Sequence, residues 1–286
     1  MRLRPMAIAG ATAAAAIGGA MMIASKHRQF RRSTEADVRA VFSASENGVG
    51  RAELDARWDT LPVPIQRHLT YAITTAAPSV RIARLRHAGT FRTGPDRRWS
   101  PIVGEQYFST CRPGFVWFAS MRVAPLVWIQ ARDRLVNGRG NMLIKPLSAF
   151  AIADASGPEI DQGAALRWLA ESVWFPYAFA ADTVSWEAID ARSARASLRT
   201  AGSPVQAIFE VDADGRIVQL HAERFRDLGG GRSVLTPWSG RYSDYAEFGG
   251  FRVPSSVEVT WDLTNGPFSY ARFNLTALEY NVPEPF

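Results

Sequence analysis

The spacing of apolar residues changes along the chain near residue 79. Before this point, apolar residues recur about every four positions, which places them on one face of a helix: Leu61, Ile65, Leu69 and Ile73. After it, apolar and polar residues alternate, as in strands with one buried face, and residues 205–211 show this most clearly. The pattern therefore predicts helices first and a long β-rich segment after them.

Three short helices are predicted before the sheet. The first begins at a cap on Ser33 or Thr34 and ends near Phe42, with acidic residues in its first turn. The second covers residues 52–58. The third begins at Pro64, because proline suits the first turn of a helix.

Four turn signals separate the strands that follow. Residue pairs that favour tight turns occur at Asn137-Gly138, Asp214-Gly215, Gly249-Gly250 and Asn265-Gly266. The expected strands cover residues 80–91, 99–110, 115–123, 127–135, 184–189, 194–200, 205–211, 216–226, 242–245, 253–261 and 270–280. These ten or eleven strands are nearly all joined locally, which indicates an antiparallel sheet. Strands and helices do not alternate as they would in a doubly wound fold.

One longer helix interrupts the strands. Asp161 is its expected cap and Pro176 ends it, and its apolar face consists of Leu166, Leu169, Ala170, Val173 and Trp174. We expect this face to lie across the concave side of the sheet. The predicted fold class is therefore α+β: a large, strongly twisted antiparallel half-barrel of about ten strands, with a helix across its concave face and further helices at the N-terminus.

An uncharged segment near the N-terminus has the length of a membrane span. Residues 6–25 carry no charge and consist mainly of Ala, Gly, Ile and Met. Arg2 and Arg4 precede them, and four further Lys/Arg follow by residue 32. This favours an uncleaved, single-pass membrane anchor with its basic flank at the lipid headgroups. A cleaved signal peptide, with small residues near Gly18 and a secreted mature chain, is the alternative.

The rest of the chain is electrically balanced. Six of the 33 Lys/Arg lie in residues 1–32, so 27 remain against 27 Asp/Glu in the part that folds. A nucleic-acid-binding domain needs a basic surface of its own, so nucleic acid is not an expected partner. The bases that follow the uncharged segment favour a cytoplasmic globular part, while the side of the membrane and the oligomeric state stay open. The chain divides into a membrane segment (1–32), a helical cap (33–78) and a β-rich domain (79–286).

Charge is unevenly distributed within the β-rich domain. Residues 79–150 carry twelve Lys/Arg and three acids, Asp96, Glu105 and Asp133. Opposite charges that pair across neighbouring strands on a solvated face explain this pattern. A basic face that meets anionic lipid is the second interpretation.

A series of short motifs resembles one protein family. The motifs occur in the order Leu61-Pro62-Val63-Pro64-Ile65-Gln66-Arg67-His68-Leu69, Pro113-Gly114-Phe115-Val116-Trp117, Arg132-Asp133, Gly138-Arg139-Gly140, Leu166-Arg167-Trp168-Leu169-Ala170-Glu171, Trp174-Phe175-Pro176 and Pro237-Trp238-Ser239-Gly240. Together they resemble an uncharacterised bacterial family, a domain of unknown function often preceded by a membrane helix. The resemblance covers about residues 50–282 and implies no established activity.

A second, more distant resemblance concerns the fold. The strand-rich plan, with Phe251-Arg252-Val253-Pro254 before a long strand, looks like the lipoprotein-localisation-factor fold. The resemblance implies a half-barrel whose concave face holds acyl chains. Likeness in fold does not by itself establish function.

Four charged residues are candidates for a polar site. Arg167 and Glu171 lie four positions apart on the expected helix, so their side chains can pair. Arg132 and Asp133 are neighbours on an expected strand, where successive side chains point to opposite faces. Asp133 alternates in step with apolar residues, so it points inward and needs a partner. An ordinary ion pair, a polar anchor at the mouth of a cavity and a catalytic role for Asp133 all remain open.

Nine tryptophans make aromatic packing the most unusual feature of the composition. Most of the rings are expected in the core. Large rings beside a helix on a curved sheet can nevertheless leave an apolar pocket. The expected ligand-binding set combines rings and polar residues: Trp117, Trp128, Arg132, Asp133, Arg167, Trp168, Glu171, Trp174 and Phe175.

These features favour a membrane-tethered domain that binds a lipid or other apolar ligand without covalent chemistry. A hydrolase-type enzyme that uses Glu171, Asp133 and Arg132 is one alternative, and a structural or interaction module of the cell envelope is another. No metal or other cofactor is expected, because the four histidines lack metal-site spacing and Cys111 has no partner thiol. The sequence also lacks a serine nucleophile elbow and the glycine loops that bind phosphates or dinucleotides.

Overall fold

The computed structural model describes residues 5–45, 48–125, 127–202 and 204–286, and for residues 5–17 the backbone alone. Its helices are α1 (Pro5–Ser43), α2 (Arg51–Arg57), η1 (Trp58–Thr60), α3 (Val63–Ala72), α4 (Pro158–Glu171), η2 (Ser172–Trp174) and η3 (Pro176–Ala180), where η marks a 3₁₀ helix. The helices predicted at 52–58 and from Pro64 correspond to α2 and α3 and are confirmed.

All described strands form one antiparallel sheet. The strands are β1 (Ile82–Phe91), β2 (Ser100–Ser109), β3 (Gly114–Ala124), β4 (Val127–Val136), β5 (Arg139–Pro146), β6 (Ala153–Ala155), β7 (Val184–Ala188), β8 (Ser193–Leu198), β9 (Val205–Val211), β10 (Ile217–Gly229), β11 (Arg232–Phe248), β12 (Phe251–Leu263) and β13 (Gly266–Tyr280). Their order is β6-β5-β4-β3-β2-β1-β13-β12-β11-β10-β9-β8-β7. The predicted antiparallel architecture is confirmed.

The sheet has 13 strands, and the prediction of ten or eleven was too low. The three residues of β6 are too few to show an alternating pattern. The strand predicted over 242–245 is the end of β11, which begins ten residues earlier. Pro237 lies inside β11 and pairs with Glu223, and a proline within a strand pattern hides the strand from sequence reasoning.

The predicted turns are where the strands reverse. Asn137 and Gly138 have φ angles of 51° and 74°, the left-handed conformation that a two-residue hairpin turn between β4 and β5 requires. Asn and Gly are the residues that adopt this conformation most readily. The turn residues therefore set the pairing register between β5 and β4, the strand that carries Asp133.

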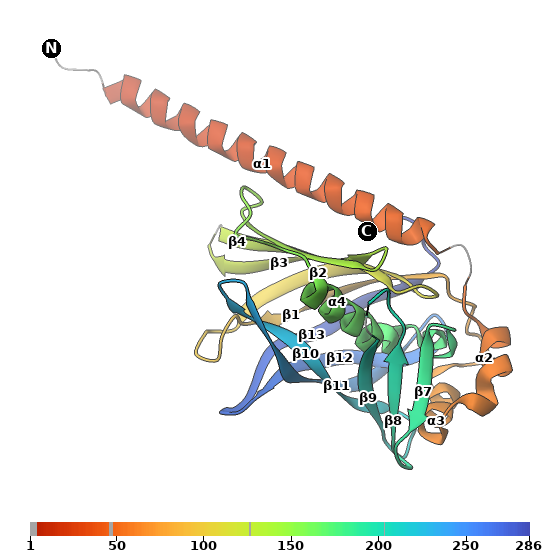
Figure 1. Cartoon of the computed structure of the whole chain (residues 1–286). Coiled ribbons are helices and arrows are strands. Elements are labelled where there is room, and N and C mark those ends of the chain that lie inside the picture. Colours follow the sequence, from red (N-terminus) through yellow and green to blue (C-terminus); the bar gives the residue numbers. More distant parts are fainter. Residues whose placement is uncertain (1–4, 46–47, 126, 203) are drawn as a thin grey trace.

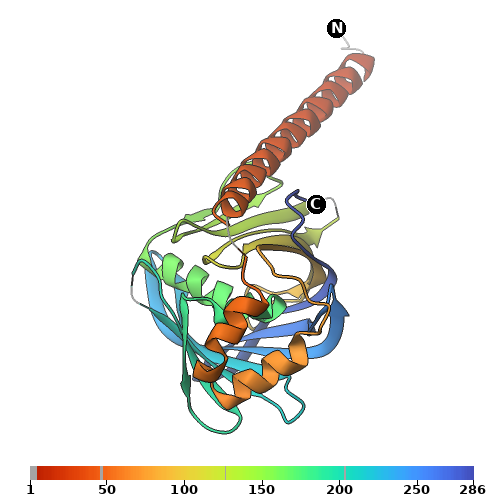
Figure 2. The same ribbon diagram turned by 90° about the vertical axis from the view of Figure 1, so that its right-hand side faces the viewer.

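The sheet curves into a half-barrel, and α4 lies across its concave side (Figure 1). The helix packs against β5 near one edge of the sheet and against β9 and β10 near the other. Figure 2 shows α2 and α3 over one end of the sheet. The position predicted for the helix is confirmed, and α4 joins two parts of the sheet that are far apart in strand order.

The start predicted for this helix was wrong. The helix begins at Pro158 after Gly157, and Asp161 lies in its first turn. The Asp161 carboxylate accepts a hydrogen bond from the Gly140 N–H on β5 at 2.6 Å. Asp161 therefore holds the helix to the sheet instead of capping it. The helix also ends earlier than Pro176, because η2 and η3 continue the chain as tighter turns.

The other face of the sheet is covered by the C-terminal part of α1. Phe30 packs against Phe118 and Leu143, and Val38 packs in a second apolar cluster with Tyr107. Around them, Asp37 forms ion pairs with two strand arginines, and Arg31 pairs with Glu105. This helix is therefore docked on the convex face by both apolar and charged contacts.

A helix start at Ser33 or Thr34 was also predicted wrongly, since one helix runs through both residues. No glycine or proline lies between residues 20 and 43 to interrupt it. The two hydroxyl groups donate to the Phe30 carbonyl of the preceding turn, an alternative to capping an N-terminus. Whether the segments on either side of residue 32 act as separate units stays a prediction.

The predicted membrane segment falls largely on residues whose side chains are not described. Residues 1–4 lie outside the described part of the chain, and residues 5–17 belong to α1 by their backbone alone. Where side chains are described, no helix is long and apolar enough to cross a membrane.

Close packing between α4 and β5 generates a first prediction. A Cβ atom added at Gly140 would lie 2.7 Å from the Ile160 carbonyl oxygen of α4. Gly140→Ala should therefore push the helix from the sheet and lower the free energy of unfolding by about 1–3 kcal/mol, as overpacking does. Urea denaturation measures this change.

Gly94→Ala is the matched control, because its Cβ would meet only the flexible Arg97 side chain at 3.3 Å. We expect the free energy of unfolding of this variant to equal that of the parent. Equal stability of the two variants would contradict the close packing of α4 on β5.

Candidate functional site

A cavity of about 320 Å³ lies between α4 and the concave face of the sheet. This volume is at the lower end of the range of small-molecule sites, roughly 300–1,000 Å³. Most of its wall is apolar and comes from eight strands, α4 and the Trp174 turn. The apolar lining residues include Phe91, Ile102, Trp117, Ala119, Met121, Ile129, Ala131, Met142, Ile144, Ile152, Ala170, Trp174, Trp238, Val257, Val259, Ala271 and Phe273.

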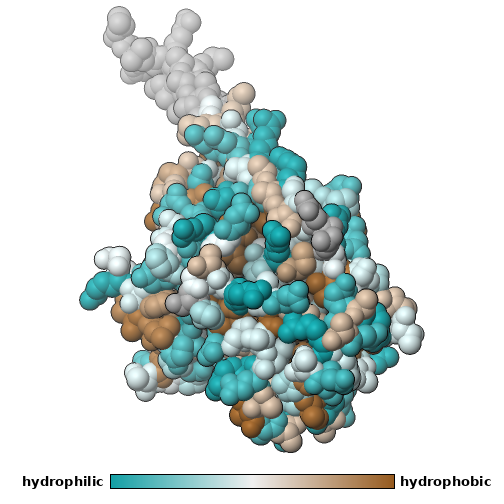
Figure 3. Space-filling model, turned by 45° about the vertical axis from the view of Figure 1, so that its right-hand side comes forward, coloured by the Kyte–Doolittle hydropathy of each residue, from teal (hydrophilic) through white to brown (hydrophobic). Residues whose placement is uncertain are grey.

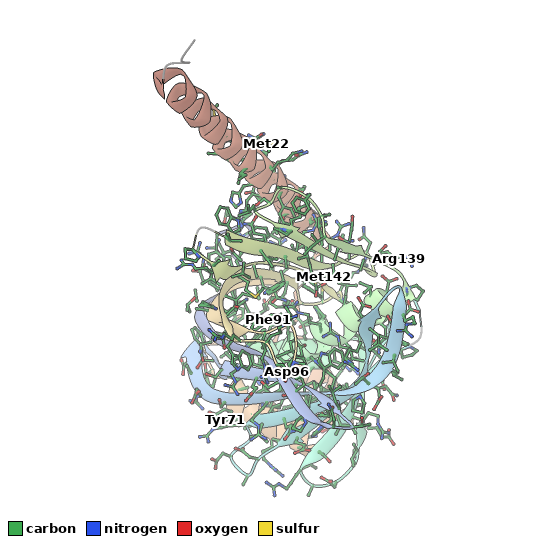
Figure 4. The ribbon with its side chains drawn as sticks, turned by 90° about the vertical axis from the view of Figure 1, so that its left-hand side faces the viewer. Met22, Tyr71, Phe91, Asp96, Arg139 and Met142 are labelled. Atoms are coloured by element: carbon green, nitrogen blue, oxygen red, sulfur yellow. The ribbon has the colours of Figure 1, made fainter. Side chains whose placement is uncertain are left out.

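The cavity opens at the end of the sheet that carries the β1–β2, β3–β4, β10–β11 and β12–β13 hairpins. Two lining residues at this end, Thr93 and Ile152, are exposed. Figure 4 views the molecule from this side, with Phe91 and Met142 near the middle of the view. The opposite half of the barrel is filled by aromatic rings, including Phe108, Phe115, Trp168, Phe175 and Phe179.

A buried cluster of polar side chains forms the inner end of the cavity. The Arg167 guanidinium on α4 donates to Glu171 at 2.8 Å, to Asp133 on β4 at 2.9 Å and to the Gln106 side-chain oxygen on β2 at 3.0 Å. Gln106 donates in turn to the second oxygen of Glu171 at 2.6 Å. The cluster thus ties α4 to two strands of the sheet.

The cluster contains two carboxylates and only one guanidinium, and both carboxylates contact that guanidinium. Burial alone lowers the pKa of Arg167, but the carboxylates of Glu171 and Asp133 outweigh this effect and the net shift is upward. Burial raises the pKa of Glu171 above its ordinary value. Arg167 therefore stays charged, and Glu171 takes up a proton more readily than a solvated carboxylate.

Arg167 also rests on aromatic rings. Its guanidinium carbon lies 4.8 Å from the centre of the Trp117 ring and 5.1 Å from that of Phe115. The Trp117 indole N–H donates to His87 Nε2 at 2.8 Å, so the proton of neutral His87 is on Nδ1. Burial, with the Arg167 charge as a second cause, lowers the pKa of His87 to about 3. His87 is a neutral partner that orients Trp117.

A second arginine, Arg224 on β10, lies at the mouth of the cavity. Its guanidinium carbon is 5.2 Å from the Trp238 ring centre and 5.9 Å from that of Trp261, and Nη1 is 3.5 Å from the Tyr270 hydroxyl. Among the described residues it has no carboxylate within 4.0 Å, and its buried Nε has no hydrogen-bond partner. A Cβ at Gly163 would lie 3.3 Å from this Nε, so glycine leaves room for the guanidinium.

The structure brings together five of the nine residues in the predicted ligand-binding set. Trp117, Asp133, Arg167, Glu171 and Trp174 line the cavity. The inward orientation predicted for Asp133 from strand alternation is the one observed, with the side chain buried and paired to Arg167.

The remaining four predicted residues do not line the cavity. Trp168 and Phe175 lie on the far side of α4 and η2, where they pack in the filled half of the core. Trp128 alternates with Ile129 and lies on the other face of β4. Helical spacing alone could not separate a ring that lines the cavity from one that fills the core.

Arg132 is also outside the cavity, and the expected pocket of Glu171, Asp133 and Arg132 is not formed. Arg132 points to the convex face, where it pairs with Asp37 of α1 at 2.9 Å and donates to Asn141 at 3.2 Å. Its partner on α1 lies nearly a hundred positions away in sequence. Strand alternation already places Arg132 and Asp133 on opposite faces.

Gln106 and Arg224 were not identified from the sequence. Both carry an alternation signal: Gln106 is in step with Ile102 and Phe108 on β2, and Arg224 is in step with Leu220 on β10. A polar residue at an inward position of a strand is the pattern that marks both of them.

Across the described residues, no three side chains of His, Cys, Asp or Glu gather closely enough to hold a metal ion. Cys111 is a half-buried free thiol at the edge of the core.

The motifs quoted above recur in one family of proteins. A family profile matches residues 53–273 of the chain, about three quarters of its length. The chain belongs to this family, described as "Family of unknown function (DUF6544)". The resemblance to an uncharacterised family that was predicted from the sequence motifs is thereby confirmed, and all seven quoted motifs fall within the matched range. No curated protein matches the chain.

Solved structures of other families are similar to this DUF6544 chain over much of its length. A LolA superfamily protein from Nitrosomonas europaea is 10% identical with a TM-score of 0.42, covering 77% of this chain and 95% of its own. A DUF1329 family protein from Desulfovibrio piger is 11% identical with a TM-score of 0.44, covering 78% of this chain and 95% of its own. These values describe a distant likeness.

Removal of Arg167 tests the polar cluster. Arg167→Met leaves two buried carboxylates without their cation, so we expect the free energy of unfolding to fall by about 3–5 kcal/mol. Arg195→Met is the control, because its ion pair with Glu187 is largely exposed and is worth less than about 1 kcal/mol. Urea denaturation at neutral pH compares the two, and equally small losses would contradict a structural role for the cluster.

The two buried histidines predict that acid destabilises the fold. Burial lowers the pKa of His68 to about 4, although the Gly215 carbonyl and Asp212 act in the opposite direction. Burial lowers the pKa of His87 to about 3. The unfolded chain binds these protons near pH 6.5, so stability is complete above that pH and falls as the pH decreases. At about pH 4 each histidine accounts for a loss on the order of 3 kcal/mol.

The test is urea denaturation at a series of pH values from neutral to acidic. At each pH, the urea concentration at the unfolding midpoint is measured for the parent and for a variant with both His68→Gln and His87→Gln. The variant should show a shallower dependence on pH, whatever its stability at neutral pH. Parallel curves for parent and variant would show that other groups cause the acid sensitivity.

Proposed function

We propose that this protein binds a lipid or other apolar molecule in the cavity under α4, without covalent chemistry. The observation that carries the proposal is a largely apolar cavity that is closed by a polar cluster at one end and open at the other. Apolar ligands gain free energy when they leave water for such a wall, at roughly 25 cal/mol per Å² of buried surface. The shape suits an extended chain that enters from the hairpin end.

The same proposal includes a tether to the membrane through residues 6–25. Their composition and length support a membrane span, and basic residues follow them. The binding domain would then remain beside a bilayer, which is the source of many apolar ligands. We expect the full chain to stay in membranes that are washed with high salt. Cleavage at an engineered protease site after residue 25 should release the rest of the chain.

Arg224 gives the proposed ligand a polar end. An arginine at a cavity mouth with no acidic partner among the described residues is suited to an anionic group, because guanidinium binds carboxylate or phosphate oxygens in pairs. The apolar part of the ligand would extend inward past Met121 and Ile129 toward Trp174. We therefore propose an amphiphile with an acidic group as the ligand class.

The polar cluster at the inner end acts in this proposal as a structural lock. Asp133 and Glu171 both pair with Arg167, and Glu171 also accepts a hydrogen bond from Gln106, so the cluster holds both carboxylates in fixed positions. Arg132, the third member of the alternative hydrolase site, lies on the opposite face. The arrangement supports ligand binding more strongly than hydrolysis.

Native mass spectrometry of the full chain extracted from membranes tests the proposal. We expect a co-purified lipid that is lost from Ala131→Phe, because the ring would occupy the cavity beside Ile129. Ala188→Phe is the control: it adds the same ring at an exposed position on β7, away from the cavity. A parent protein without bound lipid, or a lipid retained equally by both variants, would overturn the proposal.

The role of Arg224 predicts a difference between two ligands of equal chain length. Arg224→Gln should weaken binding of dodecanoate about tenfold, which corresponds to about 1.4 kcal/mol. Binding of dodecanol should change little, since it has no charge for the guanidinium to pair with. Isothermal titration calorimetry measures both, with Arg252→Gln, remote from the cavity, as the control. Equal losses for acid and alcohol would show that Arg224 contributes packing alone.

A further inference from the structure

We infer that the hairpin end of the barrel is a docking surface for an anionic lipid bilayer, so that the cavity mouth faces the membrane. This surface, the rim, consists of residues 92–99, 122–125, 127, 147–152, 226–235 and 262–266. The inference rests on the proposed function, because it assigns a partner surface to the mouth of the same cavity.

Exposed apolar residues gather at the rim. Seven of the twelve large hydrophobic residues that are exposed in the described chain lie there, with 39–62% of their surface accessible: Val123, Val127, Phe150, Ile152, Leu228, Val234 and Leu235. The opposite end of the sheet contributes Ile189, and Val63 lies on α3 beside that end. A concentration of apolar side chains around one opening is typical of an interaction surface.

These residues form one surface because the topology brings the hairpins together. The Leu147 N–H donates to the Trp128 carbonyl, which places the 147–152 segment beside the β3–β4 hairpin. The β1–β2, β10–β11 and β12–β13 hairpins lie at the same end of the antiparallel sheet. In Figure 3, which brings the opposite end forward, hydrophobic residues are scattered among hydrophilic ones.

The charge of the rim fits an anionic partner. Its segments carry six arginines against three aspartates: Arg92, Arg97, Arg98, Arg122, Arg226 and Arg232, with Asp96, Asp227 and Asp262. Each basic residue near an anionic leaflet adds to the attraction between the surface and the membrane. Apolar side chains surrounded by arginines match a bilayer surface, where rings and aliphatic groups enter and guanidinium groups stay at the headgroups.

Helix α1 holds the rim close to the proposed membrane span. The helix is continuous from Pro5 to Ser43, and His27 joins it to the barrel near the rim, where its Nδ1 lies 3.2 Å from both Gln130 Oε1 and Ser148 Oγ. Residue 25 ends the proposed span only two positions earlier, about 3 Å along a helix. Figure 1 shows the N-terminal part of α1 extending beyond the hairpin end of β3 and β4.

A fluorescence experiment on the full chain in vesicles tests the inference. Cys111→Ala removes the native thiol, and Phe150→Cys or Val63→Cys then carries one environment-sensitive dye. The two positions are matched, since each parent side chain is 62% exposed. The vesicles contain phosphatidylglycerol and a lipid with a nitroxide near the carboxyl end of its acyl chain.

We expect the dye at position 150 to be quenched several-fold more strongly than the dye at position 63. Val127→Glu and Leu235→Glu together should reduce quenching at position 150 while the anchor keeps the chain in the vesicles. Equal quenching at both positions, or none at position 150, would overturn the inference. A blue shift at position 150 without quenching would show that protein, rather than lipid, covers the rim, and would overturn it as well.

The result of this membrane-docking test can be told apart from the result of the ligand-binding test. Lipid that co-purifies with a chain whose rim is not quenched would refute docking and leave ligand binding intact. Strong quenching at the rim of a chain whose cavity holds no lipid would refute ligand binding and leave docking intact.

Discussion

The contact between Arg167 and the sheet is the interaction on which the rest of the architecture depends. A curved antiparallel sheet buries its concave face only if another element covers it, and α4 is that element. Arg167 fixes the helix by binding side chains of β2 and β4 at once. Because its charge and both carboxylates are buried together, loss of one member leaves the others uncompensated. The polar cluster therefore holds α4 on the sheet, and it lies between the filled half of the barrel and the hollow half.

This division explains why the largely apolar barrel is filled on one side of the polar cluster and hollow on the other. On one side of the polar cluster, the rings of Phe108 and Trp168 pack against Phe175, with ring centres 4.9 and 5.7 Å from its own. On the other side, the wall carries smaller residues such as Ala119 and Ala131, which are paired neighbours on β3 and β4 and leave space between this part of the sheet and α4. Arg224, held over tryptophan rings, is the charged group that the proposed ligand would meet at the mouth.

On the convex face, a helix is held by apolar contacts and ion pairs together. Here α1 covers strands β2 to β5 with few but large apolar contacts, and ion pairs surround them. The helix continues past the edge of the sheet without interruption, so the direction of its N-terminal part is coupled to the orientation of the barrel. A tether of this kind would present the hairpin end of the barrel to a bilayer in a defined orientation, in contrast to a flexible linker.

The sequence by itself determined the antiparallel sheet, its main turns, helices α2 and α3, the helix on the concave face and the inward position of Asp133. These features depend on local periodicity and turn chemistry, which are readable in short windows. The role of Asp161 and the partner of Arg132 were decided by the tertiary structure, because each depends on a residue far away in sequence: Gly140 for Asp161, and Asp37 for Arg132. Periodicity shows that a side chain points inward, but the space left between inward side chains exists only after all strands have paired.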